Sequence, residues 1–153
     1  MGLRENFQTR LKESMQARDQ MSTSTIRLIS AALKDRDIAA RSKGNTDGIP
    51  DEEILQMLQT MIKQRRESIK MYEQGNRPEL AKREADEIQI IEEFLPRQIT
   101  GPEMEDAIND TIAKEGAANI KDMGKVMNSL RADYAGQMDF GKASAVVKKK
   151  LTT

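Results

Sequence analysis

Four polar residues interrupt two apolar helical series near the middle of the chain. The first series is apolar at its inward positions except at Arg65 and Ser68. The second series, which follows Pro78, is apolar except at Glu84 and Glu87. Apolar residues at helical spacing predict one buried face for each helix, so these side chains are expected inside or beside a core. A guanidinium, a hydroxyl and two carboxylates can form a buried polar network, an acid–base arrangement or a binding site.

The two series are expected to face each other in a helical hairpin. Only a short turn centred near Asn76 separates them, and a short connection makes neighbouring helices antiparallel. One antiparallel register places Arg65 opposite Glu87 and Ser68 opposite Glu84, and the apolar members of the two series meet in the same register. Removing one partner of a buried ion pair costs roughly 3–5 kcal/mol. The sequence therefore predicts an interhelical Arg65–Glu87 pair with Ser68 and Glu84 beside it.

The residue types around this pair favour a structural role over a catalytic one. A buried polar network would fix the register of the hairpin. Catalysis would need a nucleophile or a pocket built by loops, and the sequence shows neither, so no catalytic residue is predicted. A binding role for the same four side chains stays open.

Basic residues form two further groups on exposed helical positions. Lys63, Arg66 and Lys70 follow i, i+3, i+7 spacing and form one ridge, whereas Lys121 and Lys125 form a second cluster at i, i+4. Further positive charge nearby comes from Lys142 and Lys148–Lys150. Such groups are either solvated faces or contacts to RNA phosphates. Because only 3% of the residues are aromatic, base stacking is disfavoured, and an RNA partner is expected to be a shaped, largely double-helical one.

Composition excludes several kinds of site. The 153 residues include 25 basic and 25 acidic ones, but no Cys and no His. Thiolate nucleophiles, disulfides, His-based triads and zinc sites with sulfur or imidazole ligands are therefore excluded. The glycines lack the context of a phosphate-binding loop, and the acidic residues 51–53 do not have the spacing of a calcium loop. No cofactor and no metal site are predicted, and the balanced charge gives no indication of DNA.

Hydropathy along the chain indicates neither a secretory leader nor a membrane span. The opening residues MGLRENFQTRL contain no continuous apolar stretch, and no later segment approaches transmembrane length. A reducing compartment fits the absence of Cys. The sequence therefore predicts a cytoplasmic protein without a membrane partner.

Helical periodicity continues through most of the chain and predicts an all-α fold. The apolar positions of the first two helices are Leu3, Phe7, Leu11 and Met15, then Ile26, Ile29, Leu33 and Ile38. Between them, the segment MSTSTIRL is interpreted as a break that supplies capping hydroxyls. A loop rich in Gly, Asn and Asp then leads to a third helix from Asp51 to about Gly75. A fourth helix is expected from Pro78 to Phe94–Leu95.

A domain boundary is expected at the proline-rich segment LPRQITGPEME. In this segment Thr100 and Glu103 have capping-box spacing, and Pro102 suits the first turn of a new helix. Three short helices follow, with apolar positions at Met104, Ile108 and Ile112, at Ile120, Met123, Met127, Leu130 and Tyr134, and at Phe140, Ala143, Val147 and Leu151. The expected caps of the last two are Asn119 and Asp139. The sequence thus predicts an N-terminal four-helix unit with a long antiparallel hairpin, residues 1–96, and a three-helix C-terminal domain, residues 97–153.

Three blocks of the sequence resemble the YqeY family of bacterial proteins. They read STIRLISAALKDRDI, IKQRRESIKMYEQGNRPELAKREADEIQIIEEFLP and KDMGKVMNSLRADYAGQMDFGKASAVVKKKL, and together they extend over nearly the whole chain. The positions that match the family pattern are Arg27, Lys34, Arg65, Ser68, Arg77, Glu84, Glu87, Leu95, Pro96, Asp122, Met123, Gly124, Lys125, Met127 and Gly136. Small departures are Phe94, where a Tyr is common, and Pro78 directly after Arg77.

The resemblance implies a role in translation, because the family is similar to the tail of the GatB subunit of glutamine-dependent tRNA amidotransferase. That tail helps to engage tRNA, so a tRNA-binding or accessory module is expected. A component of a carbon–nitrogen ligase with glutamine as amido-N-donor is one alternative, and a protein-interaction adaptor is another. The expected partners are tRNA, an amidotransferase or another protein. The resemblance also favours Lys121 and Lys125 over Lys63, Arg66 and Lys70 for RNA contact.

Gly124 lies between these two lysines and has no side chain. Its absence of a Cβ would let either a phosphate or a neighbouring helix approach the backbone closely. The sequence leaves both interpretations open.

Overall fold

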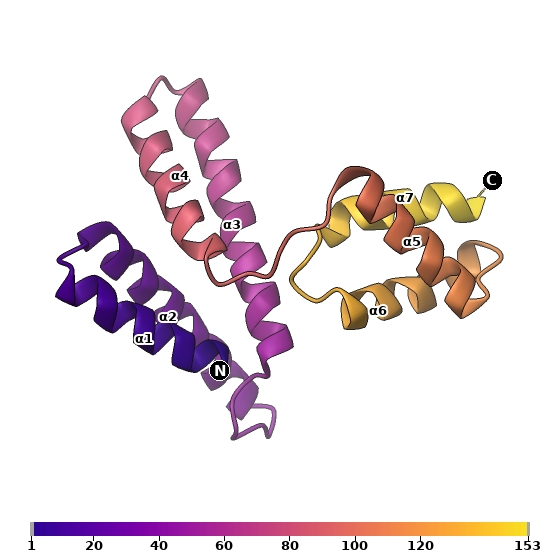
Figure 1. Cartoon of the computed structure of the whole chain (residues 1–153), viewed down its shortest axis with the longest axis horizontal. Helices are drawn as coiled ribbons and strands as arrows, with labels where there is room; N and C mark the ends of the chain where they lie inside the picture. Colours follow the sequence, from indigo (N-terminus) through magenta and orange to yellow (C-terminus); the bar gives the residue numbers. More distant parts are fainter. Residues whose placement is uncertain (1, 153) are drawn as a thin grey trace. The chain divides into compact units, whose positions relative to one another are not determined.

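The computed structural model describes residues 2–152, and in this range the chain is all-helical, with seven α-helices and no strand (Figure 1). This confirms the predicted all-α class. The chain divides into two compact units, the first ending at Leu95 and the second beginning at Pro96. Each unit has its own hydrophobic core.

Unit 1 consists of two helical hairpins. Its helices are α1 (Leu3–Gln16), α2 (Gln20–Arg41), α3 (Asp51–Gln74) and α4 (Pro78–Glu92). Helix α1 packs on α2 and α3 on α4, while α2 also contacts both α3 and α4 (Figure 1). The shared core consists mainly of Phe7, Ile29, Leu33, Ile49, Ile54, Met57, Leu58, Met61, Ile62, Ile88 and Ile91. This core fixes the α3–α4 hairpin, from which most of the candidate site projects.

Local sequence explains the ends of these helices. Three acidic residues occupy the first turn of α3, where they suit the positive end of the helix dipole. Helix α3 ends at Gln74 with Gly75 as its C-cap, and Asn76 adopts a left-handed conformation with φ of 57°. Asn is one of the residues that tolerates this conformation, so the turn can be tight. Pro78 then begins α4, where its fixed φ suits a first helical turn.

The predicted break at MSTSTIRL is wrong, because this segment lies inside α2. The chain turns earlier, at Arg18, and Asp19 caps α2 by accepting a hydrogen bond from the backbone N–H of Ser22. Ser22 and Thr25 are buried rather than free to cap. Small hydroxyl residues fill a close helix–helix contact here, and the pattern of apolar residues gives no sign of it.

The apolar stripes of α1 and α2 are also shorter than predicted. Met15 and Ile38 are 52% and 51% exposed. The buried residue near the end of α1 is instead Ser14, whose hydroxyl lies 2.8 Å from that of Thr23 on α2. A hydrogen bond thus replaces apolar packing at this end of the hairpin.

An ion pair fixes the loop between α2 and α3. Arg4 donates two hydrogen bonds to the carboxylate of Asp37, at 2.8 and 2.9 Å, and a third to the carbonyl oxygen of Ile49. Asp37 also accepts the backbone N–H of Ile49. The hydrogen bond from Arg4 lowers the pKa of Asp37 to about 2.

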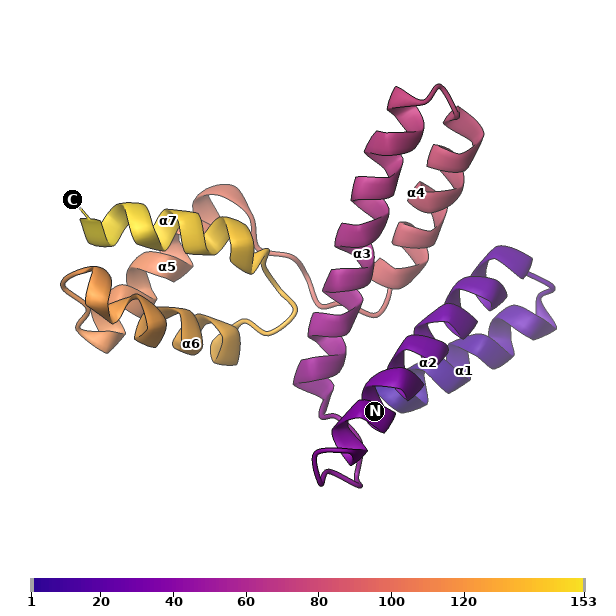
Figure 2. The ribbon, with the colours of Figure 1, turned by 180° about the vertical axis from the view of Figure 1, so that it is seen from behind.

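Unit 2 consists of α5 (Gly101–Glu115), a 3₁₀ turn η1 (Ile120–Asp122), α6 (Met123–Asp133) and α7 (Phe140–Thr152) (Figures 1 and 2). Asn119 and Asp139 cap η1 and α7 as predicted. Buried in the core are Ile99, Met104, Ala107, Ile108, Val126, Met127, Leu130, Met138, Ala143, Val147 and Leu151. Ile120 was predicted to belong to the apolar stripe of the second helix of this domain, but it is 43% exposed.

The start of unit 2 is anchored by contacts other than the predicted ones. The Thr100 side chain makes no capping hydrogen bond, so the predicted capping box is wrong, and Glu103 pairs instead with Arg97. The backbone N–H of Ile99 donates to the carbonyl oxygen of Gln137, and Gln98 donates to that of Gly136. Residues 98 and 99 are therefore tied to unit 2.

Candidate functional site

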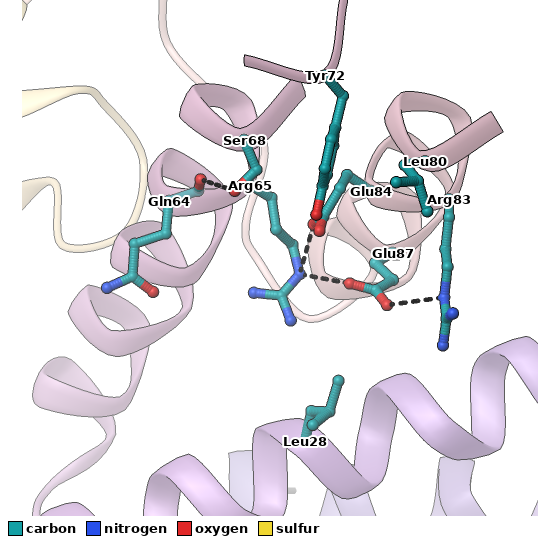
Figure 3. A pocket seen from close by; sticks show the side chains of 9 residues that line it. All are labelled: Leu28, Gln64, Arg65, Ser68, Tyr72, Leu80, Arg83, Glu84 and Glu87. Carbon is teal, nitrogen blue, oxygen red and sulfur yellow. Dashed lines mark hydrogen bonds and ion pairs between the residues drawn. The ribbon is translucent and has the colours of Figure 1, made fainter. Parts of the chain in front are cut away.

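A polar pocket of about 400 Å³ opens in unit 1 between the two hairpins (Figure 3). Its lining comes from three helices: Leu28 of α2, Gln64, Arg65, Ser68 and Tyr72 of α3, and Leu80, Arg83, Glu84 and Glu87 of α4. The four polar residues that the sequence places opposite each other thus meet at one pocket.

Arg65 is the centre of this arrangement. Its Nε donates to Glu87 Oε2 at 2.8 Å, and its Nη1 donates to the carbonyl oxygen of Met61 at 3.2 Å. The side chains of Arg65 and Glu87 are only 15% and 10% exposed. On the other side of Glu87, the Nε of Arg83 lies 3.9 Å from Oε1. Glu87 therefore has a guanidinium group on each side, and the one of Arg65 is hydrogen-bonded to it.

Ser68 and Glu84 do not pair as predicted. The hydroxyl of Ser68 donates to the carbonyl oxygen of Gln64, four residues earlier on the same helix, at 3.1 Å. This local bond satisfies a serine in the interior of a helix without an interhelical partner. Glu84, 22% exposed, is left with one ion pair, 3.9 Å from the Nε of Arg65.

This geometry supports binding rather than covalent catalysis. The Ser68 hydroxyl is bonded to a backbone oxygen and has no base directed at it. Among residues 2–152 no three acidic side chains gather as metal ligands would. What the pocket offers is a half-buried guanidinium with free edges, a second exposed guanidinium, and a carboxylate without a close partner.

The basic ridge of α3 is exposed. Arg66 forms a long ion pair with Glu92 of α4, at 3.6 Å. Lys63 and Lys70 are exposed on the same helix. The ridge does not line the polar pocket.

The basic residues of unit 2 fall into two places. Lys121 lies in η1 and Lys125 in the first turns of α6, and η1 packs on α7. The connection between α5 and α6 and the C-terminal end of α7 lie at the same end of unit 2 in both views (Figures 1 and 2). The exposed Lys148 and Lys149 of α7 therefore belong to the end that carries Lys121 and Lys125. We call these four lysines the basic end.

Two residues predicted to add charge here do not belong to the basic end. Lys142 lies in the first turn of α7, so helix length separates it from the other lysines. Lys150 forms an ion pair with Glu105 at 3.1 Å.

Gly124 is exposed within the basic end and has open space around it. A Cβ built at this position would meet no atom within 4 Å. The interpretation that Gly124 permits close helix packing is therefore wrong, whereas its backbone is open to approach from outside. Asp122, between the lysines, accepts hydrogen bonds from the backbone N–H groups of Ala118 and Asn119, and these bonds lower its pKa.

Several residues of the family pattern have structural tasks. Gly136 has φ of 73°, a conformation that favours glycine, and its carbonyl oxygen accepts Gln98. Met127 lies in the core of unit 2, and Arg77 pairs with Glu79 at the start of α4. Arg27 and Lys34 are exposed on α2. Tyr72 and Leu80 are apolar members of the two facing series, but sequence reasoning missed Leu28 and Arg83, because a pocket wall made by neighbouring turns has no signature of its own.

Among the described residues no helix is long and apolar enough to cross a membrane.

The chain matches the YqeY family, described as "Yqey-like protein", over residues 4–151. It is also similar to curated yeast proteins named "Altered inheritance of mitochondria protein 41, mitochondrial". The protein of Vanderwaltozyma polyspora is 31% identical over 92% of this chain and 78% of its own length. Those of Lachancea thermotolerans and Saccharomyces cerevisiae are 31% and 27% identical over 59% and 62% of this chain. These matches span about half of those two relatives, 46% and 49%.

The prediction of a cytoplasmic protein is wrong by this comparison, because the relatives are named as mitochondrial proteins. The reasons for that prediction were the absence of Cys and of long apolar segments. Both features are compatible with more than one compartment, so they do not identify the cytoplasm.

Proposed function

Because the chain belongs to the YqeY family, we propose that it is an accessory RNA-binding module that contacts the backbone of a structured RNA through the basic end of unit 2. The observation that carries this proposal is the exposure of Lys121, Lys125, Lys148 and Lys149 at one end of the unit. Lys–phosphate contacts need only such exposed, mobile ammonium groups.

The residues of unit 2 that match the family pattern also support RNA contact at the basic end. Met127 and Gly136 serve packing and a turn, and Asp122 is bonded to backbone N–H groups. Gly124 and Lys125 have no such internal task, since both are exposed and Gly124 has open space at its Cβ position. A phosphate group could approach the Gly124 backbone between the two flanking lysines.

The partner proposed is tRNA, on the basis of the resemblance to the tail of GatB. Shape and backbone recognition suit a chain with few aromatic residues for base stacking. A component of a carbon–nitrogen ligase with glutamine as amido-N-donor remains the alternative within the family resemblance. That alternative requires activity that depends on glutamine and ATP and is seen only with added subunits.

The test compares two variants of matched charge loss. Lys121→Ala/Lys125→Ala removes two charges of the basic end, and Lys63→Ala/Arg66→Ala removes two from the ridge of α3. Binding of fluorescent tRNA is measured at one low salt concentration, with circular dichroism as a folding control. The first variant is expected to bind roughly tenfold more weakly, because each exposed charge contact contributes up to about 1 kcal/mol, and the second variant is expected to bind like wild type. Loss only in the second variant, or no tRNA binding by wild type, would overturn the proposal.

A further inference from the structure

The polar pocket of unit 1 contains donors and an acceptor that the fold leaves without close partners. Arg65 uses Nε and one hydrogen of Nη1 within the protein, so its Nη2 group has no hydrogen bond to a described residue. A guanidinium carries five N–H donors, and the free ones form a fork suited to a carboxylate. Figure 3 shows the terminal nitrogens of Arg65 directed away from Glu84 and Glu87.

Glu84 supplies the complementary unsatisfied group. Its carboxylate is 22% exposed and has the 3.9 Å ion pair with Arg65 as its one interaction among the described residues. That distance is too long for a hydrogen bond. A half-buried carboxylate gains most from a charged donor that can reach it directly.

The charge balance of the pocket selects the kind of ligand. Arg65 and Arg83 carry two positive charges, and Glu84 and Glu87 carry two negative ones, so the four groups sum to zero. A simple anion would meet two carboxylates and a simple cation two guanidinium groups, and like charges at such distances repel. A ligand with both charges can place each one against an opposite partner.

Size and apolar lining narrow the ligand further. The pocket measures about 400 Å³, which is in the range of small-molecule sites. Leu28, Leu80 and Tyr72 supply apolar surface beside the charged groups, and Leu28 is a large apolar side chain that is 46% exposed. An aliphatic side chain could cover this surface.

We propose that this pocket binds a small zwitterion of the free α-amino acid class. The free N–H groups of Arg65, assisted by Arg83, take the carboxylate, and Glu84 takes the ammonium group. One carbon atom separates the two charges of an α-amino acid, and Arg65 and Glu84 lie 3.9 Å apart at their nearest charged atoms. Leu28 and Leu80 face the side chain of the ligand. This inference is independent of the RNA-binding proposal, since it concerns the other unit.

The test uses the full chain and the common amino acids as probes. Each amino acid is titrated singly, and binding is followed by amide chemical shifts in ¹⁵N-labelled protein. At least one amino acid with an aliphatic side chain is expected to shift the signals of residues that line the pocket. Its N-acetyl derivative, its amide and inorganic phosphate are expected not to, since each lacks one of the two charges. Binding of phosphate or of both derivatives as strongly as the parent would overturn the proposal, as would the absence of any binding amino acid.

Matched variants assign the site. Arg83→Gln and Arg66→Gln each remove an exposed arginine that has one long ion pair with a glutamate, at 3.9 and 3.6 Å, but only Arg83 lines the pocket. Likewise Glu84→Gln removes the charge of a pocket residue and keeps its shape. Glu92→Gln makes the same change outside the pocket and is its control. Glu84→Gln is expected to weaken binding roughly ten- to hundredfold, the range of a hydrogen bond to a charged group. Equal affinity for Glu84→Gln and Glu92→Gln would contradict the assignment.

Discussion

The polar pocket of unit 1 and the basic end of unit 2 use charged residues in opposite ways. In the pocket, Arg65 is half-buried, Glu87 is buried, and a 2.8 Å hydrogen bond joins them. At the basic end, Lys121 and Lys125 are exposed, and the carboxylate between them is bonded to backbone N–H groups. The first arrangement stabilises a fold, because burial makes each charge depend on its partner. The second contributes little to folding and leaves its charges available.

The largest expected effect is the loss of stability on removing one partner of the buried pair. Arg65→Ala leaves Glu87 with only the long ion pair to Arg83, so the free energy of unfolding is expected to fall by about 3 kcal/mol. Urea unfolding followed by circular dichroism measures it. Replacing both partners, Arg65→Met with Glu87→Leu, is expected to recover most of the loss. If the free energy of unfolding of Arg65→Ala stays within about 0.5 kcal/mol of wild type, the pair does not stabilise the fold.

Cleavage between the units provides the next test. We expect limited proteolysis to cut between Leu95 and Gln98, because residues 96–98 are exposed. Ile99, directly after them, is protected, since it is 5% exposed and hydrogen-bonded to Gln137. Two protected fragments are expected on gels and by mass spectrometry. Early cuts within α3 or within α6 instead would speak against two units that fold separately.

The smallest expected effect concerns pH and the ion pair between Arg4 and Asp37, which is intermediate in exposure between the pocket and the basic end. The folded pKa of Asp37 is about 2, below its ordinary value of 3.8. Its contribution is therefore present above pH 3.8 and is lost as the pH falls toward 2. Because the Arg4 side chain is 39% exposed, the contribution is expected to stay under about 1 kcal/mol. Comparing Asp37→Asn with wild type by urea unfolding at pH 6 and pH 2.5 measures it, and a difference that grows on acidification would contradict the assignment.

The sequence predicted the α3–α4 hairpin better than the α1–α2 hairpin. In α3 and α4 the apolar spacing is regular, and Gly75, Asn76 and Pro78 mark the turn. One register then places Arg65 opposite Glu87, as the structure does. Between α1 and α2 no Gly or Pro marks the turn, and the hydroxyl residues of MSTSTIRL are the nearest residues typical of a break. Ser14, Ser22 and Thr25 are buried there, which requires knowledge of how closely the two helices approach.

The candidate sites show the same limit. Helical spacing predicts which residues share a face, and it brought Arg65, Glu84 and Glu87 to one place. It could not foresee that Ser68 bonds to its own helix, because local and interhelical partners are equally compatible with the pattern. Nor could it separate Lys142 from Lys121 and Lys125, since their positions depend on how α7 packs on η1.

The measurement that tests the central claim most directly is the salt dependence of tRNA binding by wild type and the Lys121→Ala/Lys125→Ala variant, with urea unfolding of both. If the basic end contacts phosphates and does not stabilise the fold, the slope of log affinity against log salt becomes less steep in the variant, by roughly one to two units. The free energy of unfolding then stays within about 0.5 kcal/mol of wild type. An unchanged slope with unchanged stability would contradict the account.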